Sequence, residues 1–246
     1  MKNTIQIISM IFFFLLCSVS AYTLPMIDGT FNTSEWGGNV FSEDNASGTG
    51  NTYLGPGWGG QYYDVEYLGL YISGTTVYFG LQTGFDIING ANQFSNTTID
   101  PGDFAISING NDNSYEYGVS LDGLTANSTT LEVHKVFTWN DVLYNAHNSA
   151  APFTMDTSSL EGYASVAYGE SFDGTDTHYV LEGSFDLGLF GGDFTGNELA
   201  IKWTMECGND FGLITATPTP VPEPATLFLM GIGLLGFSSV RRKKKA

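Results

Sequence analysis

The fold class is decided by one stretch, YLGLYISGTTVYFGL at residues 67–81. Two runs rich in aromatic and β-branched residues flank the connection at residues 73–76, which contains a glycine. Such an arrangement predicts an antiparallel hairpin.

The same kind of pattern recurs through the body of the chain. Apolar residues alternate with small or polar ones at residues 104–108 and 131–134, and residues 109–113 form an Asn- and Gly-rich turn. Residues 179–185 and 199–207 supply late strands. Helical periodicity is nearly absent, so we expect an all-β fold. The predicted architecture is one antiparallel two-sheet sandwich, jelly-roll-like, over residues 22–216.

Residues 199–207 carry the clearest alternation. Ile201, Trp203, Met205 and Cys207 share one face, and Lys202 lies on the other. Cys207 is therefore expected in the core as a small apolar side chain. Pairing with another chain and nucleophilic reactivity are the alternatives.

The charge distribution excludes one class of partner. The chain has 26 acidic and 8 basic residues, but six of the basic residues lie at its two ends. Residues 22–240 therefore keep two basic residues against all 26 acids, a net charge of −24. Such a body should repel nucleic acid, because phosphate binding needs clustered Lys and Arg, and it should attract cations.

The N-terminal residues 1–21 have the pattern of a signal peptide. A lysine is followed by an apolar run and then by small residues that end at Ala21. We expect signal peptidase to cut between Ala21 and Tyr22, so that the body is exported.

The C-terminal residues divide into three parts. Residues 217–224 form a Pro-rich extended spacer, residues 225–240 are uncharged and largely apolar, and residues 241–246 are basic. As a helix, the apolar part would span about 24 Å, which crosses a bilayer with help from flanking residues or local thinning. The basic tail should stay in the cytoplasm, in agreement with an exported body.

This C-terminus resembles the PEP-CTERM sorting signal. The shared parts are Pro222-Glu223-Pro224, the short apolar helix and the basic cluster that begins with Arg241 and Arg242. The resemblance implies that exosortase, a membrane enzyme of bacteria that typically make exopolysaccharide, removes the tail near Pro-Glu-Pro. It further implies an anchored precursor and a mature form at the cell surface or in the extracellular matrix. A plain C-terminal anchor, the alternative, would not need Pro-Glu-Pro.

The body is similar in order to carbohydrate-binding and DOMON-like jelly rolls. The resemblance consists of Ile27-Asp28-Gly29 followed by Trp36 and then the aromatic strands. It implies a site that binds glycans through exposed aromatic rings, with exopolysaccharide as a partner.

Two tryptophans are candidates for such a platform. Trp58 lies in a Gly-rich loop and Trp139 in a polar segment, whereas Trp36 and Trp203 have the pattern of core residues. The alternative is that Trp58 and Trp139 cap the ends of the fold.

Calcium is a possible cofactor, because it takes six to eight oxygen ligands and the body is acidic. The weak candidates are Asn111 and Asp112 in one turn and Asp173 and Asp176 in another. The alternative is that these side chains stabilise their own turns.

A non-enzymatic protein is predicted, and the alternatives are a structural surface protein braced by calcium and a secreted glycan-active hydrolase. Asp64 and Glu66 would have Cα atoms about 6.6 Å apart on one strand face, which suits two carboxylates that act on a glycosidic bond. With so many acids, a solvated strand face is the stronger interpretation. The three histidines match no zinc motif.

Overall fold

The computed structural model describes residues 24–42, 60–92, 98–110, 114–143, 150–196 and 198–219. No helix in this described part is long and apolar enough to cross a membrane. Several predictions fall outside it: the signal peptide with Ala21 and Tyr22, the helix at 225–240, the sorting residues Pro222, Glu223, Pro224, Arg241 and Arg242, and the candidates Trp58, Asn111 and Asp112.

The described chain consists of strands and three short 3-10 helices. The strands are β1 (Val40–Ser42), β2 (Val65–Ser73), β3 (Thr76–Thr83), β4 (Ala91–Asn92), β5 (Thr98–Ile99), β6 (Phe104–Ser107), β7 (Tyr117–Val119), β8 (Thr130–Asn140), β9 (Thr154–Phe172), β10 (Thr177–Asp186), β11 (Leu199–Thr204) and β12 (Phe211–Ala216). The helices are η1 (Thr33–Trp36), η2 (Gln61–Tyr63) and η3 (Leu187–Phe190).

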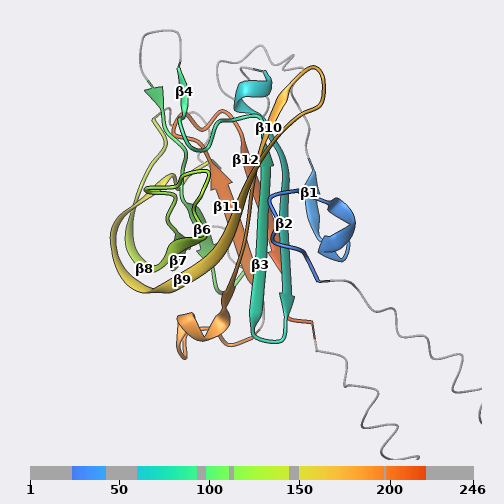
Figure 1. Cartoon of the computed structure of the whole chain (residues 1–246). Helices are drawn as coiled ribbons and strands as arrows, with labels where there is room; N and C mark the ends of the chain where they lie inside the picture. The colour runs from blue at the N-terminus through green and yellow to red at the C-terminus, as the bar shows by residue number, and fades with distance from the viewer. Residues whose placement is uncertain are drawn as a thin grey trace, which may run out of the picture.

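Ten of these strands form one antiparallel sheet in the order β1-β2-β3-β10-β9-β8-β7-β6-β11-β12, and β4 pairs only with β5 (Figure 1). The all-β antiparallel prediction is confirmed. The predicted hairpin at residues 67–81 is β2–β3, with Ser73 opposite Thr76. The two faces expected of a sandwich belong to one continuous sheet that curves round and nearly closes.

The curvature is carried largely by β9, which has 19 residues. A straight strand of that length would extend about 60 Å, whereas a compact domain of about 200 residues has a radius of gyration of about 16 Å. Residues 154–165 pair with β8, and residues 165–172 pair with β10. Three register shifts between β8 and β9, opposite Val133 to Trp139, supply the bends that let this ribbon wrap round the core.

The two ends of the sheet meet where β12 packs against β2. Three contacts join them along a line that we call the seam. Asp210, just before β12, accepts the backbone N–H of Val65 at 2.7 Å, at the start of β2. The side-chain amide of Asn39 donates to the carbonyls of Leu70 (2.7 Å) and Thr215 (3.0 Å).

The third seam contact lies just beyond β12. The backbone N–H of Thr219 donates to the carbonyl of Ile72 at 3.1 Å, and Thr219 forms an isolated parallel bridge with Ser73. The first residues of the predicted spacer therefore lie against the sheet.

The interior is filled by one apolar core. Trp203 and Cys207 are buried in it, as predicted. Lys202, on the opposite face of β11, is also buried, and its Nζ donates to the carbonyl of Ala151 and lies 4.8 Å from the ring centre of Phe211. That face is therefore covered by the segment that precedes β9 rather than by solvent.

Trp36 belongs to the N-terminal segment of residues 24–38, which we call the strap. Its side chain is buried against the outer face of the sheet. Its indole lies flat over Gly69 and Gly80, which face each other across β2 and β3. Phe31 stacks on Trp36 and on Tyr67, with ring centres 5.2 and 5.6 Å apart. Only glycine leaves room for a ring so close to the backbone.

We expect Gly80→Ala to lower the free energy of unfolding by about 2 kcal/mol, because a Cβ at this position would lie 2.5 Å from Cζ2 of Trp36. Urea denaturation measures the change. Gly192→Ala is the control, since its Cβ would meet nothing within 4 Å. Equal stability of the two variants would contradict the packing role of Trp36.

Candidate functional site

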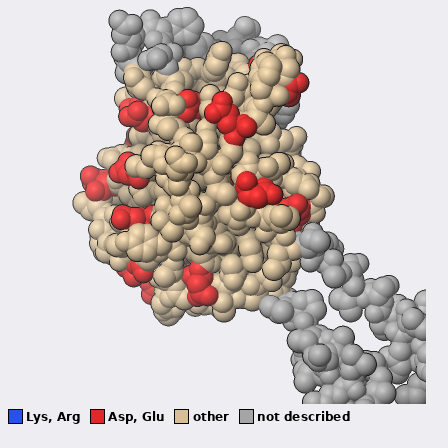
Figure 2. Space-filling model, in the orientation of Figure 1, with Lys and Arg blue, Asp and Glu red and all other residues tan. Residues whose placement is uncertain are grey.

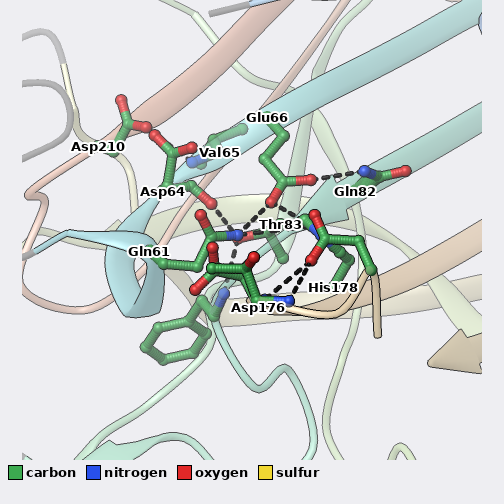
Figure 3. A network of polar contacts seen from close by, with 12 residues as sticks. Gln61, Asp64, Val65, Glu66, Gln82, Thr83, Asp176, His178 and Asp210 are labelled. Atoms are coloured by element: carbon green, nitrogen blue, oxygen red, sulfur yellow. Dashed lines mark hydrogen bonds and ion pairs between the residues drawn. The ribbon is translucent and has the colours of Figure 1, made fainter. Parts of the chain in front are cut away.

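A polar network surrounds Glu66 at the end of the sheet where β2 begins (Figure 3). Oε1 of Glu66 accepts a hydrogen bond from the side chain of Gln61 and lies 2.6 Å from Nδ1 of His178. Oε2 accepts from Gln82 at 2.5 Å. A register shift in β2 between Val65 and Tyr67 turns Glu66 toward these partners.

His178 lies between two carboxylates. Its Nδ1 contacts Glu66, and its Nε2 lies 3.4 Å from Oδ2 of Asp173. Partial burial alone would lower the pKa of His178, but the hydrogen bonds and charges of Glu66 and Asp173 together raise it. His178 therefore ties the β9–β10 turn to the start of β2.

Asp64 and Glu66 do not form a solvated strand face, so that interpretation is wrong. Both residues are buried, and Asp64 precedes β2 rather than lying in it. The carbonyl of Asp64 accepts hydrogen bonds from Thr83 Oγ1 (2.5 Å) and from the backbone N–H of Gly84 (3.0 Å). These contacts fix the end of β3 beside the start of β2, and both oxygens of Glu66 are hydrogen bonded within the protein.

The candidate calcium ligands Asp173 and Asp176 lie in one turn. Oδ1 of Asp173 accepts the backbone N–H groups of Thr175 (2.8 Å) and Asp176 (2.9 Å). These hydrogen bonds lower the pKa of the Asp173 carboxyl. Within the described ranges, no group of three or more His, Cys, Asp or Glu side chains could hold a metal ion. Calcium binding remains a prediction.

An aromatic surface lies beside this network, on the inward face of the β9–β10 hairpin, and we call it the rim face. It consists of Tyr168, Glu170, Phe172 and Tyr179, which share one side because Glu170 lies opposite Tyr179 and strand residues two apart point the same way. Phe172 is 66% exposed. The hairpin extends beyond Thr83, the last residue of β3, so this side emerges from the core into solvent.

Two residues from other parts of the chain, Tyr62 and Asp86, act on the rim face through their charge. Tyr62 lies in η2 and is 72% exposed. Burial raises the pKa of Tyr179, and the charges of Asp86 and Glu170, followed by Tyr62, raise it further, so these groups lie within electrostatic range of Tyr179. The sequence pattern alone does not predict this grouping. Phe172 and Tyr179 flank the polar turn at residues 173–176, but only the register of the β9–β10 hairpin shows that both belong to one face.

Trp139, the second candidate for a glycan platform, lies elsewhere. It is half-buried on β8, its Nε1 donates to the carbonyl of Tyr115 at 2.8 Å, and its ring covers Gly118. The ring is thus fixed against the sheet with part of its surface open.

Glu182 explains the role of the Ile27-Asp28-Gly29 motif. This glutamate is fully buried on β10, and its Oε2 accepts the backbone N–H groups of Asp28 (3.1 Å) and Gly29 (3.0 Å). Its Oε1 is buried and has no hydrogen-bond partner among the described residues. The motif therefore attaches the strap to the sheet through its backbone, while the side chain of Asp28 is exposed.

Comparison with known proteins identifies the tail alone. Residues 220–243 match the PEP-CTERM protein-sorting motif. No curated protein and no solved structure matches the chain. The chain therefore carries a C-terminal sorting and anchoring signal of the kind that exosortase processes, which confirms that resemblance.

The buried carboxyl of Glu182 should make stability depend on pH. Burial raises its pKa to about 7, although the amides of Asp28 and Gly29 act in the opposite direction. Between its unfolded pKa of about 4.5 and pH 7, the folded protein therefore binds the proton more tightly than the unfolded chain. This contribution to the free energy of unfolding is complete below pH 4.5 and falls by about 3 kcal/mol as the pH rises through 7.

Urea denaturation of the wild type and Glu182→Gln from pH 4 to 8 measures this dependence. The stability of the wild type relative to Glu182→Gln should fall by about 3 kcal/mol as the pH rises through 7, because glutamine does not titrate. Glu161→Gln, at an exposed position, should run parallel to the wild type. If the curve of stability against pH for Glu182→Gln ran parallel to that of the wild type, Glu182 would have an ordinary pKa.

Proposed function

We propose that this chain is a non-enzymatic exported surface protein that is processed through its C-terminal motif and then associates with extracellular polysaccharide. The sorting motif at residues 220–243 is the observation that carries the proposal, because it indicates export, C-terminal anchoring and exosortase as a partner. The β-sheet domain is the part that would remain at the cell surface or in the matrix.

The rim face supports the polysaccharide partner. Sugar rings stack their C–H faces on aromatic side chains, while their hydroxyls donate to carboxylates. Phe172 and Tyr62 supply exposed rings, and Glu170 and Asp86 supply carboxylates whose charges act on Tyr179 of the rim face. Trp58, the first candidate from the sequence, precedes η2 closely in the chain.

The charge of the domain favours a neutral polysaccharide. Figure 2 shows acidic side chains scattered over the visible face, with no Lys or Arg among the described residues there. Lys202 is buried, and Lys135 pairs with Asp193 at 2.6 Å. An anionic polymer would therefore be repelled over most of the surface.

The surroundings of Asp64 and Glu66 support a non-enzymatic role. A hydrolase needs its two carboxyl groups on either side of a bound glycosidic bond. Here both residues are buried, and Glu66 is held by Gln61, Gln82 and His178. This arrangement suits a structural junction better than contact with a polymer.

Deletion of residues 222–246 should release soluble protein into the medium with an unchanged melting temperature, because every strand and Thr219 are retained. Cell fractionation and thermal melting measure this. The control replaces Pro222, Glu223 and Pro224 with alanine and keeps the apolar segment, so it should remain in the membrane unprocessed. Normal maturation of the control would show that the motif is not used.

Phe172→Ala and Tyr62→Ala should each weaken retention on polysaccharide purified from the producing cells by about tenfold, the equivalent of about 1.4 kcal/mol lost from ring stacking. Trp58→Ala should act in the same direction. Phe137→Ala and Tyr163→Ala are matched controls, because these rings are 63% and 58% exposed on other parts of the sheet. Equal retention of Phe172→Ala and Phe137→Ala would remove the rim face from the proposal.

A further inference from the structure

We propose that the contact of Thr219 with β2 is a latch that restricts the access of exosortase to the sorting motif. The inference rests on the sorting part of the proposed function. It assigns to the body of the protein a control over its own processing, through residues that lie outside the motif.

The latch is built from few bonds. Both the backbone N–H and Oγ1 of Thr219 donate to the carbonyl of Ile72, at 3.1 and 2.5 Å. The N–H of Gly74 reaches the carbonyl of Thr219 at 3.5 Å. Thr219 itself is exposed. Its bridge to Ser73, the last residue of β2, is isolated and is not continued by a ladder of further pairs.

The latch holds the folded domain close to the processing site. The matched motif begins at residue 220, so Pro222 is three residues beyond Thr219. Three extended residues reach at most about 11 Å. An enzyme embedded in the membrane must bind extended chain on both sides of the bond that it cuts, and a docked domain would occupy that space.

Opening the latch relieves this restriction without opening the sheet. β12 ends at Ala216, so release of residues 217–219 places Pro222 six residues beyond the domain, about 21 Å when extended. The six-residue pairing of β12 with β11 remains, as do the seam contacts of Asp210 and Asn39. Such local opening is much cheaper than unfolding.

Processing should therefore follow the population of the open latch. When opening is fast relative to cleavage, the cleavage rate is proportional to the open fraction. Loss of the Thr219 hydrogen bonds should raise this fraction about tenfold.

A graded series of full-length variants in the producing cells tests the latch, with pulse-chase conversion of precursor to mature protein as the readout. Thr219→Val loses only the Oγ1 bond, and Thr219→Pro also loses the N–H. Processing should accelerate in that order, by about tenfold for Thr219→Pro. Thr217→Ala, at an exposed position in the same segment, should match the wild type. Unchanged processing of Thr219→Pro would overturn the proposal.

A disulfide that holds the latch closed should have the opposite effect on processing. Directly paired strand residues lie about 4.8 Å apart, a distance that a disulfide can bridge, so Ser73→Cys with Thr219→Cys should crosslink. The buried Cys207 should stay outside this pair. Processing should stop in the oxidised variant and resume when a reductant is added. Wild-type processing with the disulfide intact would refute the latch.

The motif variant separates the two proposals. If alanine at Pro222, Glu223 and Pro224 leaves processing intact, the sorting proposal fails. If that variant is not processed while Thr219→Pro and the crosslinked variant behave as the wild type, only the latch fails.

Discussion

Closure of a single ten-stranded sheet is the constraint on which the rest of this structure depends. The last strand of the sheet, β12, runs beside β2 in the same direction, yet no regular backbone ladder joins the two among the described residues. Asp210, Asn39 and Thr219 join them at the start, middle and end of β2. Because these contacts come from loops and side chains, a few residues determine whether the apolar interior is sealed.

Closure also places two features at opposite ends of β2. The Glu66 network and the rim face lie where this strand begins, whereas Thr219 docks where it ends. Ser73 lies seven residues beyond Glu66, about 23 Å along an extended strand. In Figure 1 the β9–β10 hairpin accordingly lies at the end of the sheet opposite the β2–β3 turn, near which the described chain ends.

Local patterns in the sequence were enough to predict the β2–β3 hairpin, the core side of β11 and the sorting tail. They could not predict contacts between residues far apart in the chain. Glu66 meets His178 and Glu182 meets Gly29 only after strand register is set. For the same reason, counting acids made Glu66 seem a surface residue, although three side chains hold it in a buried position.

Threonine and proline alternate before the motif, and this alternation limits how a neighbouring copy of the chain can pair with this segment. The N–H of Thr219 points toward β2, and adjacent residues of an extended segment point their N–H groups to opposite sides. Pro218 therefore occupies the position whose N–H would point away from β2, and proline has no N–H to donate. A neighbouring copy therefore finds no continuous row of amides with which to extend the sheet. Fibril growth by strand addition would therefore be disfavoured at this edge.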